Sequence, residues 1–325
     1  VSDVLSGKQP FTLPMIRALH QHLGIPAEVL LQDSRSEPGE RDDPSDPSLD
    51  WSRFPLNEMM KRGWVKTVAS AKSKAEGLIR ELIDAAGGFG AVPMPLCRRN
   101  DSMRQNAKTD TYALLAWCLK VLALARADKL SGGYVKESVT LDFLSKLAKL
   151  SADADGPKRA KAALSEIGVH LICLAHLPKT YLDGAALRDV QGGSPVVALT
   201  LRYDRLDNFW FSLLHELAHV GRHLDGEVEA FVDDFSLREA PARHEDIRED
   251  EADAWANEAL IPEEMWATSG LNAHPSYTGI INFAQRIGVH PAIVAGRIRH
   301  KTRNYRAFAP LLGKGEVRKQ LELAK

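Results

Sequence analysis

The sequence predicts an α+β fold that is mostly helical and carries one small β-sheet. Apolar residues recur with helical spacing over most of the chain, whereas β-rich runs are confined to residues 169–201. Apolar residues make up 44% of the 325 residues and charged residues 26%, which is ordinary for a globular protein. A chain of this length buries a sizeable core without disulfides and forms about two domains.

Composition divides the chain into five parts. Residues 34–50 hold three prolines and eight charges, so they cannot bury enough apolar surface to offset their ordering entropy. We expect this segment to be a flexible linker between a short helical head, 1–33, and a helical region, 51–157. A mixed domain, 158–270, and a basic helical segment, 271–325, follow.

Each element within these parts has a local signal. Double glycines at 87–88 and 132–133 separate helices, and Asp207 is expected to cap the long helix that begins there. The head is expected to hold two or three short helices. Elsewhere the expected helices are 57–62, 68–86, 110–127, 141–150, 159–167, 207–224, 249–260, 280–287 and 291–299, and the expected strands are 169–174, 184–188 and 196–201.

Charge is balanced overall but polarised along the chain. There are 42 lysines and arginines against 43 aspartates and glutamates, so a chain-wide basic surface for nucleic acid is excluded. Residues 225–264 hold 15 acidic residues against three arginines, a net charge of −12. Residues 271–325 hold ten basic residues against two glutamates, a net charge of +8. We expect the basic segment to balance the acidic one within the fold, and a nucleic-acid surface is the alternative.

Cysteine usage and hydropathy point to the cytoplasm. Cys97, Cys118 and Cys173 are far apart and lack a CxxC pairing, which is typical of a reducing compartment. The best membrane-span candidate, 112–127, is too short and carries two cations. No charged segment followed by an apolar run opens the chain as a signal peptide would. We therefore expect a cytoplasmic protein with no membrane partner.

Residues 215–219, His-Glu-Leu-Ala-His, form an HExxH motif within an apolar helix. Histidines four residues apart lie about 40° apart around a helix, so His215 and His219 can reach one metal ion. Glu216 lies on the flank, where its carboxylate can take a proton from a water molecule at the metal. The alternative is a core helix with a fortuitous glutamate, but burying these groups without a partner is costly.

A catalytic zinc needs a third protein ligand and an open position. Asp225 falls ten residues after His215, but the turn that this arrangement needs would require glycine where the chain has Arg222. His223 is one turn beyond His219, but three ligands along one straight helix diverge from the ion. Neither residue is therefore the preferred ligand.

The following helix, 249–260, supplies a better third ligand, Glu249. Glu249 and Asp253 are four residues apart and share a face, so Glu249 can bind the ion while Asp253 accepts a hydrogen bond from a ligand histidine. Small residues, the alanines at 252, 256 and 259, let this helix lie close to the HExxH helix. Glu251 is the main rival ligand. The alternative is a solvated acidic face on an amphipathic helix.

These motifs resemble the ImmA/IrrE metallopeptidases. The resemblance covers roughly residues 159–266, and it is carried by 207–219, 249–256 and 260–262. It implies a gluzincin-type domain, with HExxH on one helix and ExxxD on the next, and Zn2+ as the cofactor. His215, His219 and Glu249 would be its ligands, and Glu216 the general base of metal-assisted peptide hydrolysis.

A second electrophile usually stabilises the oxyanion of such a reaction. On position alone the candidates are Arg243, His244 and His223. For each, a structural or surface role is the preferred interpretation.

The head resembles the second half of an Xre/HigA-type helix-turn-helix domain, a class often fused to an ImmA/IrrE domain. The resemblance is carried by residues 1–8, 12–13 and 23–26. Most of the recognition helix would precede Val1, so Ser2, Ser6 and Lys8 are only nominal DNA contacts. DNA is an expected partner of the head only if residues before Val1 exist.

We therefore expect a zinc-dependent endopeptidase linked to transcriptional regulation. By family resemblance, its protein substrate would be a specific repressor or antitoxin. The alternative is a DNA-binding transcriptional regulator or antitoxin whose peptidase-like domain acts as a sensor or partner-binding module. A third interpretation is a structural metal in a protein-interaction domain.

Overall fold

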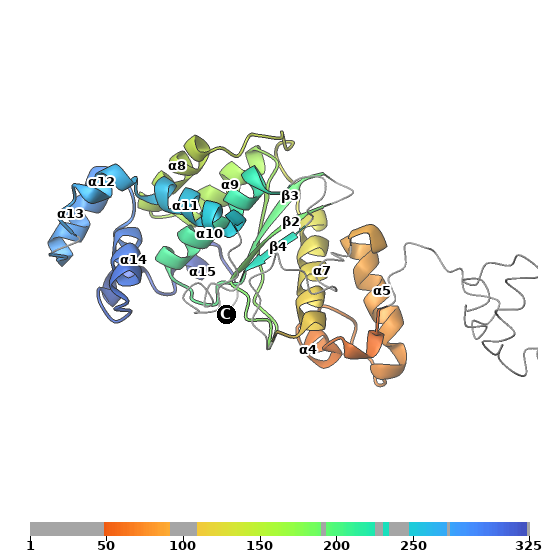
Figure 1. Ribbon diagram of the computed structural model, residues 1–325. Helices are drawn as coiled ribbons and strands as arrows, with labels where there is room; N and C mark the ends of the chain where they lie inside the picture. Colours follow the sequence, from red (N-terminus) through yellow and green to blue (C-terminus); the bar gives the residue numbers. More distant parts are fainter. Residues whose placement is uncertain are drawn as a thin grey trace, which may run out of the picture. The chain divides into compact units, whose positions relative to one another are not determined.

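A computed structural model of the chain describes most of one compact unit, residues 47–325 (Figure 1). The described residues are 49–91, 109–189, 193–224, 230–233, 247–271 and 274–323. The expected helix-turn-helix head and nearly all of the expected linker lie outside them. The described part is mostly helical with one small sheet, which confirms the predicted α+β class.

Four short strands form a mixed sheet in the order β1-β3-β2-β4. β1 is parallel to β3, whereas β2 is antiparallel to both β3 and β4. Three strands lie close to the predicted ones, and β4 falls in the acidic run, where no strand is expected. The strands are β1 (His170–Cys173), β2 (Gly184–Arg188), β3 (Pro195–Leu199) and β4 (Ala230–Asp233).

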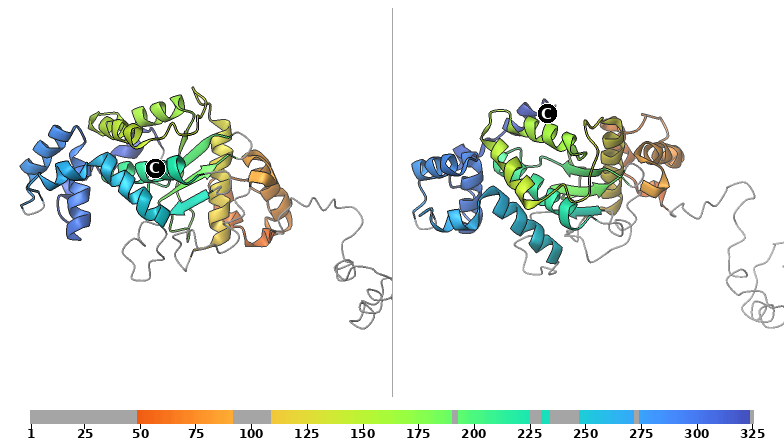
Figure 2. Two further views of the ribbon diagram at one scale, coloured as in Figure 1. Left: turned by 45° about the horizontal axis from the view of Figure 1, so that its top comes forward. Right: turned by 90° about the horizontal axis from the view of Figure 1, so that it is seen from above.

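Helices pack on both faces of the sheet (Figure 2). The limits of the predicted helices agree with the structure at most ends, within the usual uncertainty of one or two residues. The short helices at 263–267 and 316–320 were not predicted. The helices are α4 (Leu56–Lys61), α5 (Ala75–Ala86), α7 (Thr111–Ala127), α8 (Leu141–Lys149), α9 (Gly156–Glu166), α10 (Leu206–Arg222), α11 (Ile247–Leu260), α12 (Glu263–Ala267), α13 (Tyr277–Ile287), α14 (Pro291–Thr302) and α15 (Glu316–Gln320).

Alternate residues of each strand enter two different hydrophobic cores. Along β3, Val197 and Leu199 join the core that contains α10, whereas Val196 and Ala198 join the core that contains α7 and α5. This alternation is the period-2 geometry of a strand with both faces covered. It explains why the strand sequences read as nearly continuous apolar runs.

Two local predictions about helix starts are wrong. The helix expected over 68–86 begins with a 3-10 turn at Lys72, because the β-branched Thr67 and Val68 and the serine at 70 have low helix propensity. Val68 instead lies partly buried against the α5/α7 core. Asp207 is not the N-cap of α10, since Arg205 holds that position and donates from Nε to the Asp207 carboxylate at 2.9 Å.

The segment after α11 packs back onto the HExxH helix. Residues of α13 and α14 belong to the same core as α10. At the α10–α14 contact, a Cβ added to Gly296 would lie 2.8 Å from Asp207 Cβ, so the close approach depends on glycine. In the described part of the chain, no helix is long and apolar enough to cross a membrane.

Two arginines of the basic segment make contacts inside the fold. Arg297 forms an ion pair with Glu263 and stacks over the ring of Trp266 at 4.7 Å. Arg299 is buried and donates to the carbonyl oxygen of Ala307 at 3.1 Å. These two side chains therefore stabilise the fold rather than form an exposed basic face.

Candidate metal centre

The middle of α10 carries the HExxH motif into the core. His215, Glu216 and His219 are each 0% exposed. The Nε2 atoms of His215 and His219 lie 3.1 Å apart, as expected for residues one helical turn apart that point at the same spot. The helix therefore presents two imidazole nitrogens toward one point.

Glu249, in the first turn of α11, reaches the same point. Its side chain is 1% exposed, with Oε2 at 3.5 Å from His215 Nε2 and Oε1 at 3.4 Å from His219 Nε2. One ligand atom from each of the three residues lies within 4.8 Å of the others. Ala252, Ala256 and Ala259 are buried, in keeping with the close packing of α11 on α10.

This set of donors fits a zinc ion. Two neutral imidazoles and one carboxylate are the ligand types of catalytic zinc sites, which keep a further position open. A cation at this point would also offset the cost of burying the Glu249 carboxylate. The residues present therefore suit the metal that the sequence predicts.

Asp253 lies behind His215, on the side away from His219. Its Oδ1 is 2.8 Å from His215 Nδ1, and its side chain is 22% exposed. A carboxylate in this position orients the imidazole and leaves Nε2 available to a metal. This is the contact that the Glu249–Asp253 spacing predicts for a ligand histidine.

His223 and Glu251 lie outside the three-residue cluster. His223 Nδ1 is 3.0 Å from His219 Nδ1, and His223 Nε2 is 2.9 Å from Glu251 Oε2. Burial lowers the pKa of His223, and the hydrogen bond from His223 lowers the pKa of Glu251. The two distances place both residues behind His219, on the side away from the point where His215, His219 and Glu249 meet. Asp225, Arg243 and His244 lie outside the described residues, as do Ser2, Ser6 and Lys8.

Two residues at the site went unpredicted. Gly184, at the start of β2, lies so close to Glu216 that an added Cβ would be 2.3 Å from Oε1. Phe231 of β4 stacks on His219, with ring centroids 4.3 Å apart and planes 17° apart. The glycine at a strand start and the apolar pair Phe231-Val232 in an acidic run are the signals that could have drawn attention to them.

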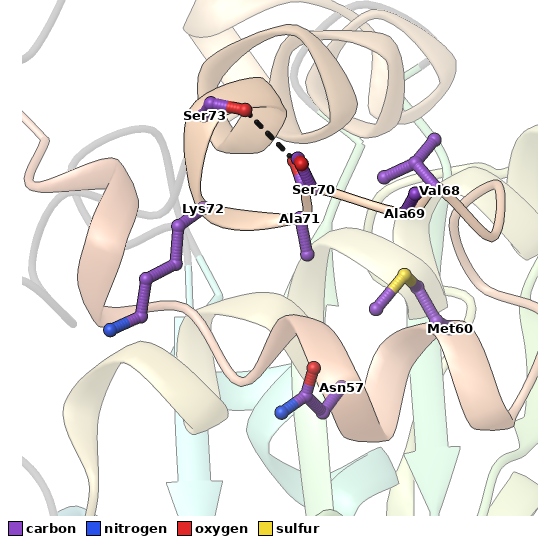
Figure 3. Close-up of a pocket in the computed structure, with 8 residues that line it drawn as sticks. All are labelled: Asn57, Met60, Val68, Ala69, Ser70, Ala71, Lys72 and Ser73. Atoms are coloured by element: carbon purple, nitrogen blue, oxygen red, sulfur yellow. Dashed lines mark hydrogen bonds between the residues drawn. The ribbon is translucent and has the colours of Figure 1, made fainter.

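A surface hollow of about 490 Å³ lies elsewhere, beside α4 (Figure 3). Its lining includes Asn57, Met60 and residues 68–73, with Lys72 the charged residue among them. The buried residues of α4 belong to the core on the other face of the sheet from α10. The hollow is therefore separate from the His-His-Glu cluster.

Residues 170–299 match the family model of peptidase M78, described as the IrrE N-terminal-like domain. The match runs from β1 through β4, the HExxH helix and α11 to the first nine residues of α14. This part of the chain is therefore similar to a peptidase-like domain of the IrrE type. Comparison with curated proteins and with solved structures found no match.

Proposed function

We propose that this protein is a zinc-dependent endopeptidase linked to transcriptional regulation, and that it cleaves a specific repressor or antitoxin protein. The fully buried cluster of His215, His219 and Glu249, with Glu216 in the same motif, is the observation that carries the proposal. The repressor or antitoxin substrate is suggested by the similarity of residues 170–299 to IrrE-type domains.

In this proposal His215 and His219 bind zinc through Nε2, and Glu249 binds it through a carboxylate oxygen. When bound, zinc supplies Lewis acidity, which lowers the pKa of a coordinated water toward about 7. Glu216 accepts the proton from the attacking water and passes it to the leaving amine. Asp253 holds the His215 ring in the tautomer that leaves Nε2 free to bind.

β4 lies against the proposed zinc site. Among the described residues it is the last strand in the order β1-β3-β2-β4, and its Phe231 contacts the proposed ligand His219. Ala230, Phe231 and Val232 are buried, so β4 packs against the site as part of its wall.

Two measurements test the proposal. Metal content by mass spectrometry should give about one zinc per chain, with much weaker retention in Glu249→Ala. Lysate of the source organism should then be treated with the zinc-loaded protein, and new N-termini should be labelled and sequenced. Glu216→Gln, which keeps the ligands, should bind zinc and yield none of these termini. Termini that persist with Glu216→Gln would refute the hydrolase.

The same experiments address the two alternatives. Zinc binding without any wild-type-specific cleavage would favour a sensor or partner-binding module. A structural metal would instead make the fold depend on zinc, so a chelator would unfold the protein at moderate temperature. A catalytic site should lose activity first and unfold later.

A further inference from the structure

Three side chains extend from the metal cluster to the surface behind His219. The Nε2 atom of His219 faces the cluster, 3.4 Å from Glu249 Oε1, while its Nδ1 is 3.0 Å from His223 Nδ1. On the far side of His223, Nε2 is 2.9 Å from Glu251 Oε2. His223 is 8% exposed, and the Glu251 side chain is 41% exposed.

These contacts have only one consistent arrangement of protons if His219 Nε2 binds a metal. That nitrogen must then offer a lone pair, so a neutral His219 carries its proton on Nδ1 and donates to His223 Nδ1. His223 accepts on Nδ1, so its own proton is on Nε2, where it donates to Glu251. Each donor thus meets an acceptor from the buried ligand to the surface carboxylate.

We propose that His223 and Glu251 are positioning residues that fix the tautomer and ring orientation of His219. This inference rests on the proposed zinc site. It assigns different supports to the two histidine ligands, since Asp253 contacts His215 directly whereas Glu251 acts on His219 through a second imidazole. It also assigns His223 a role other than binding the metal or the oxyanion.

Neighbouring groups hold this chain of contacts in place. Arg222 Nη2 is 3.6 Å from Glu251 Oε2, and the Arg222 guanidinium lies 5.3 Å from the ring centroid of Trp255. Phe231 stacks on His219 and also contacts His223, with ring centroids 5.8 Å apart. The contacts from His219 through His223 to Glu251, called the relay below, are therefore held by residues of α10, α11 and β4, which limit rotation of both imidazoles.

Two substitutions of similar shape at position 223 separate hydrogen bonding from packing. His223→Asn can place an amide oxygen near the position of Nδ1, whereas His223→Leu has a comparable branched shape and no acceptor. Outer partners of ligand histidines typically contribute 10–100-fold to metal affinity. We therefore expect His223→Leu to bind zinc about 10–100-fold more weakly than wild type, and His223→Asn to recover most of that loss. The zinc Kd is measured on the full chain by competition with a chromogenic chelator.

Glu251 provides a second test that does not alter the buried ring. Glu251→Ala should weaken zinc binding on the order of tenfold, and Glu251→Gln less, because the amide oxygen still accepts from His223 Nε2. Asp142→Asn, at an exposed carboxylate paired with Lys146, is the control and should leave the zinc Kd unchanged. A zinc Kd within twofold of wild type in Glu251→Ala would overturn the relay.

Imidazole nitrogen NMR of the zinc-loaded wild type reads the tautomers without any substitution. The relay requires the proton of His219 on Nδ1 and that of His223 on Nε2, and any other pattern refutes it. A loss of thermal stability in the position-223 and position-251 variants with an unchanged zinc Kd would also refute it, since it would show a purely structural role. If wild type itself binds no zinc, the proposed function fails first, and that result is distinct from tight zinc binding in His223→Leu.

Discussion

Gly184→Ala tests whether Glu216 must occupy one exact position. The added Cβ would meet Oε1 at 2.3 Å, Cδ at 3.0 Å and Cγ at 3.1 Å, whereas ordinary contact begins at 3.4 Å. The carboxylate must therefore withdraw by about 1 Å, and a displacement of that size can cost about 100-fold in rate. No positive φ requires glycine here, so the backbone of β2 tolerates alanine.

The stability cost should be much smaller than the loss of rate. Overpacking a core costs about 1–3 kcal/mol, and the low end applies because the displaced carboxylate is the far end of a side chain. We therefore expect a folded, zinc-replete variant whose kcat on the substrate identified by N-terminal labelling falls about 100-fold.

The matched control is Gly133→Ala, where an added Cβ has nothing within 4 Å. It should leave kcat and zinc content at the wild-type values. Full activity in Gly184→Ala, with zinc content and stability unchanged, would refute the role of Glu216 as the positioned base.

Three further predictions address the support of the site and the fold. Asp253→Asn should weaken zinc binding about 10–100-fold in chelator competition, because the carboxylate beside His215 Nδ1 loses its charge. An unchanged zinc Kd would contradict the role of Asp253 in orienting His215. Burial lowers the pKa of His290, whose Nδ1 caps α14, so the unfolded chain takes up a proton below about pH 6.5 and the folded chain does so only at lower pH. Stability of the metal-free protein in urea should therefore fall as pH drops through that range, by up to about 1.4 kcal/mol per pH unit from this group. His290→Asn, which keeps a cap that cannot titrate, should reduce the slope, and an identical slope would refute the assignment. Gly296→Ala should destabilise the protein by about 1–3 kcal/mol through its contact with Asp207, whereas Gly77→Ala, exposed and with nothing within 4 Å, should stabilise it by about 0.5–1 kcal/mol. Equal free energies of unfolding for these two variants would show that the α10–α14 contact relaxes freely.

The sequence predicted local features of the fold better than the arrangement of its layers. The strand runs and most helix limits follow from apolar spacing within ten residues, which is local information. That α5 and α7 cover the second face of the sheet depends on contacts between residues more than 50 positions apart, for example the hydrogen bond from Trp117 Nε1 to the Leu174 carbonyl oxygen. β4 went unpredicted because four residues in an acidic run carry too little periodic signal.

The same distinction holds for the candidate site. His215, Glu216 and His219 were predictable because they lie on one helix, which fixes their spacing. The Glu249–Asp253 pair was predictable because residues four apart in a helix lie on the same face. Glu251 is two residues, or about 200°, further around α11 than Glu249, so its side chain takes a different partner. The sequence could not show that partner to be His223, nor that Gly184 lies against Glu216, because both contacts join separate elements.

The composition of α11 shows why a functional helix can lack a hydrophobic stripe. Its buried positions are Glu249, Ala252, Ala256, Ala259 and Leu260, so the buried side chains of α11 are small apart from one carboxylate and the final leucine. Burial stabilises a protein by about 25 cal/mol per Å² of apolar area removed from water. Alanine side chains have little apolar area, so burying them contributes little stability. Burying the carboxylate costs several kcal/mol unless positive charge compensates it. A helix selected for stability alone would therefore place larger apolar residues here, and the proposed zinc ion between α10 and α11 would explain both features.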